Sequence, residues 1–270
     1  MKIYLLLLGC LALTACANPT NSIDKAIHEF KTAYPGNFVT YRAENQTMRY
    51  AWSGDASKQP LLFVHGSPGS YEGWSEFLLN KDLQKDFHII AVDRPGYGGS
   101  GGGVSETSLK RQAAAIIGAL AGNHSGKPAI VVGHSMGGPI IARMAMDFPE
   151  KISGLVFVSA SVNPELEKVP WYQHVAAWPV IRWALPNWLR VCNEEILPLK
   201  GELEAMLPLW PRVTAKSAIV HGDQDNLVPF ENVAFLKEKL PAGSIVHTET
   251  LPGMNHFVPW KNPGSIVNAI

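Results

Sequence analysis

Ser135 is the residue of this chain best suited to act as a nucleophile. It lies in the pattern G-H-S-M-G at residues 133–137, after the apolar run 130–132 and before residues 140–145, whose composition favours a helix. A serine at the apex of a sharp strand-to-helix turn exposes its hydroxyl, and the flanking glycines leave room for its strained backbone. A serine hydroxyl alone is a weak nucleophile, so it needs a base and an acid that orients the base.

The base is expected to be a histidine late in the chain, because in this kind of turn the acid comes second and the histidine last. His256 lies in the loop after the last apolar strand run, from which it can reach the carboxyl ends of parallel strands. We therefore predict His256 as the base. His174, His221 and His247 are interpreted as packing or surface residues.

The acid has two main candidates, Asp223 and Asp225, which both lie in the loop 221–229 after the penultimate strand run. Glu165, which follows the strand run that ends at Ser159, is a weaker candidate for the same role. The chain order alone does not separate the two aspartates.

The reaction also requires an oxyanion hole, a pair of backbone N–H groups aimed at the developing negative charge. One donor is predicted at Met136, which follows the nucleophile at a helix N-terminus where backbone N–H groups are unpaired. The second is expected in the loop 65–69, H-G-S-P-G, in which Pro68 has no N–H to offer. His65 and His134 flank backbone that must pack tightly, and we interpret both as structural.

The composition indicates a globular domain and excludes some partners. Of the 270 residues 46% are hydrophobic, and 23 basic residues balance 23 acidic ones. The chain contains no dense block of Lys and Arg, so no nucleic-acid partner is expected. It contains no histidine and carboxylate spacing typical of a metal site, so no metal or cofactor is expected. The oligomeric state is not predicted.

Apolar strand runs alternate with helical segments along the chain. This alternation predicts an α/β domain with a mainly parallel sheet covered by helices on both faces. The first two runs are expected to pair antiparallel at one edge. Eight strands are predicted, and they begin near Phe38, Met48, Leu61, Phe87, Ile130, Gly154, Ser217 and Ile245.

Residues 161–212 interrupt this alternation, because they contain no strand run but many tryptophans and prolines. We predict a small helical cap, inserted after the strand that ends at Ser159, with an amphipathic surface over a pocket. The alternative is an aromatic-rich part of the core. A cap of this composition favours an apolar acyl or alcohol group of moderate size in the substrate.

These motifs together resemble the α/β-hydrolase family, near its bacterial serine esterase and lipase branch. The resemblance rests on the loop 65–69, the turn D-R-P-G-Y-G at 93–98, the serine turn, and the pattern H-G-x-x-D-x-x-V-P at 221–229. It implies the α/β-hydrolase fold with an eight-stranded sheet. The serine nucleophile distinguishes the chain from the dehalogenase and epoxide-hydrolase branches, which use aspartate.

The resemblance also implies roles for individual residues. It assigns the acid to Asp225, leaves Asp223 to stabilise its loop, and assigns the second oxyanion donor to Ser67. The implied activity is hydrolysis of a carboxylic ester, or a related acyl bond, of a small to medium apolar substrate by Ser135, Asp225 and His256. Alternatives are C–C bond hydrolysis, amide hydrolysis or acyl transfer by the same triad, because one fold hosts many chemistries. A further alternative is a non-catalytic binding lipoprotein.

The N-terminus has the pattern of a bacterial export signal. Lys2 is followed by a short apolar run, and residues 13–16, L-T-A-C, resemble the bacterial lipobox. In a lipobox the cysteine is lipidated and becomes the first residue of the mature protein. Cys16 is therefore predicted as a lipidation site.

These features predict a signal peptide at 1–15, a lipidated N-terminus and tether at 16–37, and the hydrolase domain at 38–270. A lipid on Cys16 would anchor the domain to a membrane of the bacterial envelope, facing the periplasm or the exterior. The outer membrane is favoured, because Ala17 is not the aspartate associated with retention at the inner membrane.

Overall fold

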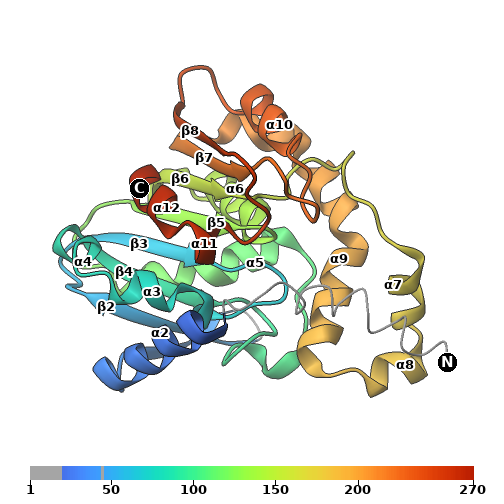
Figure 1. The fold of residues 1–270 in the computed structure, drawn as a ribbon, viewed down its shortest axis with the longest axis horizontal. Helices are drawn as coiled ribbons and strands as arrows, with labels where there is room; N and C mark the ends of the chain where they lie inside the picture. Colours follow the sequence, from blue (N-terminus) through green and yellow to red (C-terminus); the bar gives the residue numbers. More distant parts are fainter. Residues whose placement is uncertain (1–19, 44–45) are drawn as a thin grey trace.

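One sheet of eight strands forms the centre of the protein (Figure 1). The structure is a computed structural model that describes residues 20–43 and 46–270. The strands are β1 Phe38–Ala43, β2 Gln46–Gly54, β3 Gln59–Val64, β4 Phe87–Asp93, β5 Ala129–His134, β6 Ile152–Val158, β7 Lys216–Gly222 and β8 Ile245–Leu251. All eight predicted strands are present, and the predicted α/β-hydrolase fold is confirmed.

The strand order brings the loops that carry the site to one edge of the sheet. The order is β1-β2-β4-β3-β5-β6-β7-β8, and the strands from β4 to β8 in this order run parallel. The strand β2 pairs antiparallel with both β1 and β4, so the predicted antiparallel edge is confirmed. The chain moves outward from β3 to β4 and then returns to the other side of β3 as β5. Such a switch point is where open α/β sheets bind ligands, beyond the carboxyl ends of their strands.

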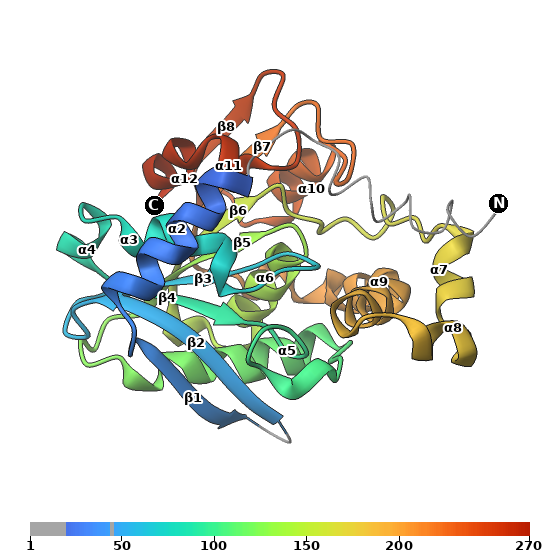
Figure 2. The ribbon, with the colours of Figure 1, turned by 60° about the horizontal axis from the view of Figure 1, so that its bottom comes forward.

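Helices cover both faces of the sheet, as predicted (Figures 1 and 2). Apolar side chains of the helices and the sheet form one core on each face. One core includes α5 Leu109–Ile116, α6 Gly137–Asp147 and α10 Asn232–Lys239. The other includes α2 Thr20–Ala33, α3 Ser75–Leu79, α4 Leu83–Asp86, α11 Val258–Lys261 and α12 Pro263–Ala269.

Helix α2 belongs to the body of the fold, although the sequence analysis assigned it to the tether. Phe30 is fully buried, and its ring packs against Phe38 and Tyr71. The folded body therefore includes α2 and does not begin at residue 38. The predicted signal peptide and Cys16 lie outside the described residues. In the part of the chain that the structure describes, no helix is long and apolar enough to span a membrane.

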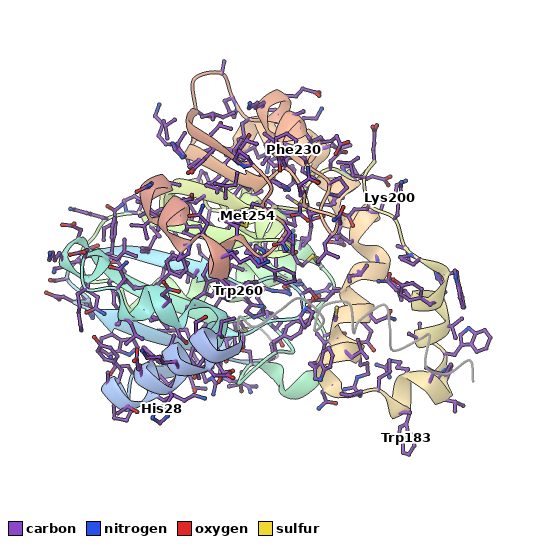
Figure 3. The ribbon with its side chains drawn as sticks, viewed as in Figure 1. His28, Trp183, Lys200, Phe230, Met254 and Trp260 are labelled. Atoms are coloured by element: carbon purple, nitrogen blue, oxygen red, sulfur yellow. The ribbon has the colours of Figure 1, made fainter. Side chains whose placement is uncertain are left out.

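The segment between β6 and β7 contains the helices α7 Trp171–Ala176, α8 Pro179–Ala184 and α9 Asn187–Met206. Trp183 is 85% exposed on α8, away from the sheet (Figure 3). Trp171, Trp178 and Trp188 are also exposed. Trp210 differs, because it is 2% exposed and packs in the same core as α6. The tryptophans of this segment are thus divided between an outer surface and the core.

The second half of α9 also belongs to the body of the fold. Leu199, Leu203 and Met206 are buried in the core that contains α6. The helical cap is therefore the first part of the predicted segment, and α9 connects it to the body. Because α9 crosses from one to the other, its side chains can contact the loops at the carboxyl edge of the sheet.

Candidate active site

Ser135 lies in the turn between β5 and α6, as the sequence predicted. Its φ is +55°, in the left-handed region that L-residues seldom adopt, and its N–H donates to Val158 O at 3.0 Å. The glycines of the turn have a steric purpose. A Cβ on Gly133 would lie 2.5 Å from the carbonyl oxygen of Gly137, closer than carbon and oxygen can approach. The serine therefore sits in a strained turn that only these small neighbours allow.

His256 and Asp225 form a buried pair at the same edge of the sheet. The imidazole Nδ1 of His256 lies 2.7 Å from Oδ2 of Asp225, and both side chains are buried. A carboxylate can only accept in this bond, so Nδ1 carries the proton. The Nε2 atom of the neutral ring is then left with a lone pair that can accept a proton.

Three further groups keep Asp225 ionised. Its Oδ1 accepts the backbone N–H groups of Leu227 and Val228, at 2.9 and 2.8 Å. Nε2 of His221 lies 3.4 Å from its Oδ2. Burial by itself would raise the pKa of Asp225, but hydrogen bonds from His221 and His256 outweigh it and hold the pKa well below its usual range. His221 is buried, as expected, yet it also contacts the acid.

His134 connects the serine turn to His256. Its Nε2 donates to the backbone oxygen of His256 at 3.0 Å, and the two rings lie 4.6 Å apart. Burial, with a smaller contribution from His256, lowers the pKa of His134 to about 3, so this ring stays neutral. The residue beside Ser135 thus positions the loop of the predicted base. A hydrogen bond from Ser135 Oγ to His256 Nε2, and the catalytic roles of the three residues, stay predictions.

The loop 65–69 lies directly against the serine turn. A Cβ on Gly66 would lie 2.9 Å from Cβ of Ser135, so only glycine fits at this approach. Among the described residues, no protein acceptor bonds the backbone N–H of Ser67 or of Met136. Both groups are therefore available for an oxyanion, and their role as its donors stays a prediction.

Among the other candidates, Asp223 and His65 make structural contacts and Glu165 is exposed. Asp223 accepts the N–H of Gly253 at 2.7 Å through its Oδ1, which fits the loop-stabilising role given to it. Glu165, the weaker candidate for the acid, has an exposed side chain. His65 uses both ring nitrogens, because Nε2 accepts the N–H of Arg94 at 2.9 Å and Nδ1 donates to Gly66 O at 2.7 Å.

The electrostatics of His65 agree with a structural role. Burial and the nearby guanidinium of Arg94 lower the pKa of His65 well below its usual value. A neutral ring with both nitrogens in hydrogen bonds has no capacity left for general-base catalysis. Elsewhere, no three His, Cys, Asp or Glu side chains of the described residues are arranged to hold a metal ion.

A buried ion pair next to the site was not predicted from the sequence. Arg94 and Glu195 are both fully buried, and their side chains meet in two parallel bonds of 2.8 and 3.1 Å. Burial would lower the pKa of Arg94, but the charge and hydrogen bond of Glu195, together with the neighbouring Tyr97, outweigh it and raise the pKa. A signal existed: Val191, Glu195 and Leu199 are spaced four apart on one helix face. A carboxylate on an apolar face requires a buried cation as its partner.

Comparisons with known proteins agree with this fold. A family model described as the alpha/beta hydrolase fold matches residues 59–192. A monoacylglycerol lipase of Mycolicibacterium smegmatis is 27% identical over 239 residues, covering 77% of this chain and 84% of that protein. A candidate lipase (lip1) of Acinetobacter baumannii has a solved structure with a TM-score of 0.68 at 18% identity, covering 91% of this chain and 93% of that one.

A further relative matches over a shorter stretch. The dihydrolipoyllysine-residue acetyltransferase component of the acetoin cleaving system of Cupriavidus necator is 34% identical over 113 residues. The match covers 42% of this chain and 29% of that protein, so the chain spans less than a third of that relative's length.

Proposed function

The chain belongs to the α/β-hydrolase fold superfamily, and on this basis we propose that it is a serine hydrolase that cleaves a carboxylic ester. The observation that carries the proposal is the buried Asp225–His256 pair next to the strained turn of Ser135. An ionised carboxylate on Nδ1 leaves Nε2 as a base, and a serine needs such a base to become nucleophilic.

The reaction follows from these roles. Ser135 Oγ attacks the ester carbonyl carbon while its proton passes to His256 Nε2, and the N–H groups of Ser67 and Met136 bind the oxyanion. The C–O bond then breaks, and the imidazolium gives its proton to the leaving alcohol. A water molecule next attacks the acyl-enzyme, with its proton taken by His256. Collapse of this second intermediate releases the carboxylic acid and returns the proton to Ser135. Asp225 stays ionised throughout.

The proposed substrate is an ester of a small to medium apolar acyl or alcohol group. The M. smegmatis relative, which matches over most of both chains, is a monoacylglycerol lipase. The segment between β6 and β7 adds support, because four of its tryptophans, Trp171, Trp178, Trp183 and Trp188, are exposed, and Arg182 is the only Lys, Arg, Asp or Glu between the first and the last of them.

A fluorophosphonate probe and p-nitrophenyl esters of increasing acyl length test the activity. Ser135 is expected to take the label, and Ser135→Ala should lose both labelling and turnover. Ser57→Ala changes an exposed serine in the β2–β3 turn and should keep both. Normal ester turnover by Ser135→Ala would refute the proposal.

The same preparation distinguishes the alternative chemistries. A protein that labels at Ser135 but turns over dienone or amide substrates faster than esters would use this site for C–C or amide hydrolysis. Transfer of the acyl group to an added alcohol in preference to water would indicate an acyltransferase. A folded protein that no serine-directed probe labels would be a binding protein.

We further propose that the mature protein is attached to the bacterial envelope by a lipid on Cys16, with the outer membrane favoured. The support is the lipobox-like sequence of residues 13–16. Membrane fractionation tests this: the wild-type protein should sediment with outer membranes and Cys16→Ser should not. Equal sedimentation of both proteins would refute the lipid attachment.

A further inference from the structure

We propose that Glu195 is a positioning residue for the oxyanion loop 65–69 and that it acts through the side-chain hydroxyl of Ser67. This inference rests on the proposed function, which gives the loop its role in catalysis. It assigns to a helix of the inserted segment, α9, the task of holding part of the active site in place.

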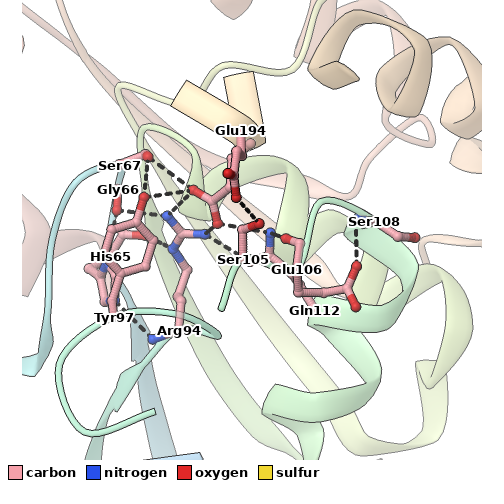
Figure 4. Close-up of polar contacts among 11 residues, drawn as sticks. His65, Gly66, Ser67, Arg94, Tyr97, Ser105, Glu106, Ser108, Gln112 and Glu194 are labelled. Atoms are coloured by element: carbon pink, nitrogen blue, oxygen red, sulfur yellow. Dashed lines mark hydrogen bonds and ion pairs between the residues drawn. The ribbon is translucent and has the colours of Figure 1, made fainter. Parts of the chain in front are cut away.

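The carboxylate of Glu195 is the centre of a closed hydrogen-bond network whose donor residues are Ser67, Arg94, Tyr97 and Gln112. These four residues are labelled in Figure 4. Its Oε1 accepts from Arg94 at 2.8 Å and from Gln112 at 3.2 Å. Its Oε2 accepts from Arg94 at 3.1 Å, from the hydroxyl of Tyr97 at 2.9 Å and from Oγ of Ser67 at 3.0 Å. Five donors therefore satisfy one buried carboxylate, which is what a buried charge requires.

The hydroxyl of Ser67 contacts this network on two sides. It donates to Glu195, and its oxygen also lies 2.7 Å from the hydroxyl of Tyr97. The Cβ atom and the backbone nitrogen of Ser67 are both bonded to its Cα atom. A fixed hydroxyl therefore limits the rotation of the N–H that the proposed reaction uses.

Arg94 holds the two residues before Ser67 in the same way. Its Nε donates to the backbone oxygen of His65 at 2.9 Å, and its terminal nitrogen donates to the oxygen of Gly66 at 2.9 Å. Three successive residues of the oxyanion loop are thus bonded to the ion pair or to its partner hydroxyl. Glu195 neutralises the guanidinium at the centre of these contacts, so the loop geometry depends on it.

The neighbouring residue Glu194 provides a matched control. It lies on the same helix but bonds to Ser105 (Figure 4) and to Arg182, neither of which bonds to Ser67. Glu194→Gln and Glu195→Gln are the same chemical change one residue apart. A difference between the two variants therefore reports the contacts of Glu195 and not the loss of a charge on α9.

The test is a kinetic cycle of Ser67→Ala, Glu195→Gln and the double variant, measured on the full chain with a p-nitrophenyl ester. Both Ser67→Ala and Glu195→Gln keep the backbone N–H of residue 67. Each single variant should therefore lower kcat about 10-fold, which is less than the ~10²–10³-fold loss that follows removal of an oxyanion donor. KM should change less than about twofold, because a misplaced N–H donor loses more stabilisation of the transition state than of the bound ester. Glu194→Gln should match the wild type.

The double variant decides between positioning and a merely structural role. If Glu195 acts through the Ser67 hydroxyl, the double variant should have a kcat close to that of the worse single variant. A kcat loss equal to the product of the two single losses would overturn the inference. So would a Glu195→Gln variant with the kcat of Glu194→Gln.

Amide hydrogen exchange of residues 65–69 tests the same point without activity. Exchange should be about 10-fold faster in Ser67→Ala and in Glu195→Gln than in the wild type and in Glu194→Gln. If Glu195→Gln does not fold, Tyr97→Phe is used in its place. That change keeps the Arg94–Glu195 ion pair and removes the Tyr97 hydroxyl that contacts Glu195 and Ser67. Equal exchange in all variants refutes the inference, whereas a wild type without serine-probe labelling refutes only the proposed function.

Discussion

Two buried histidines at the site, His65 and His134, should make the protein less stable when the pH falls from 7 to 5. Burial lowers the pKa of His134 to about 3 and also lowers that of His65 well below its usual value. In the unfolded chain both imidazoles return to a pKa near ~6.5. At a pH between the folded-state and unfolded-state pKa values, the unfolded chain binds protons on these histidines and the folded protein does not, so lowering the pH favours unfolding.

The size of the effect follows from proton linkage. Lowering the pH from 7 to 5 takes an unfolded imidazole from about one-quarter to almost fully protonated, while the folded ring stays neutral. For His134 this difference is about 2 kcal/mol of unfolding free energy, and the lowered pKa of His65 adds a further loss of stability in the same direction. Asp225 does not contribute in this range. Its lowered pKa adds stability that is lost only as the pH falls below ~4, where an unfolded aspartate takes up its proton.

Urea unfolding at pH 7 and pH 5, followed by tryptophan fluorescence, measures the loss. His134→Gln can still donate to the backbone oxygen of His256 but does not titrate, so its loss of stability between the two pH values should be about 2 kcal/mol smaller than that of the wild type. His28→Gln removes an exposed histidine of α2 and should keep the wild-type loss (Figure 3). A wild type with equal stability at both pH values, or a His134→Gln variant with the full loss, would refute the reasoning.

Three further outcomes are expected. Asp225→Asn removes the acceptor that sets the tautomer of His256, the proposed base, so kcat for p-nitrophenyl esters should fall by about 10⁴ with the fold intact; a fall below tenfold would contradict the proposed role of Asp225 as the acid. Gly66→Ala puts a methyl group 2.9 Å from Cβ of Ser135 and should reduce ester turnover at least about 10-fold, measured with circular dichroism as the folding control. Trp210→Ala should lower the unfolding free energy by about 3–5 kcal/mol and Trp183→Ala by less than about 0.5 kcal/mol, because only the first side chain is buried; equal urea midpoints would contradict this.

The strands and the serine turn could be predicted from the sequence because their signals are local. The turn needs glycines within two residues of Ser135, and the steric reason for Gly133 is confined to that turn. The runs that form β3 and β5 are short, apolar and rich in branched residues, as strands buried on both faces must be. Such features depend on neighbours along the chain and so can be read from the sequence.

The limits of the inserted segment were less predictable, because exposure depends on packing. Trp183 and Trp210 lie in the same proline-rich segment, yet one is exposed and the other is in the core. Phe30 likewise lies in a helix that the sequence analysis assigned to a tether, but it is buried against Phe38 and Tyr71. The type of a residue and its neighbours along the chain do not show whether another helix or strand will pack over its side chain.

By itself, the sequence determined the fold class, the strained turn of Ser135, and the chain order in which an acid and a histidine follow it. The tertiary structure alone decided that Asp225 and His256 meet at 2.7 Å, and that Glu195 on α9 neutralises Arg94 next to the loop 65–69. The physical reason is the separation along the chain between the residues that interact. Strand runs and turns are set by contacts a few residues apart, whereas Arg94 and Glu195 are 101 residues apart and become partners only when the sheet and the inserted helix close around them.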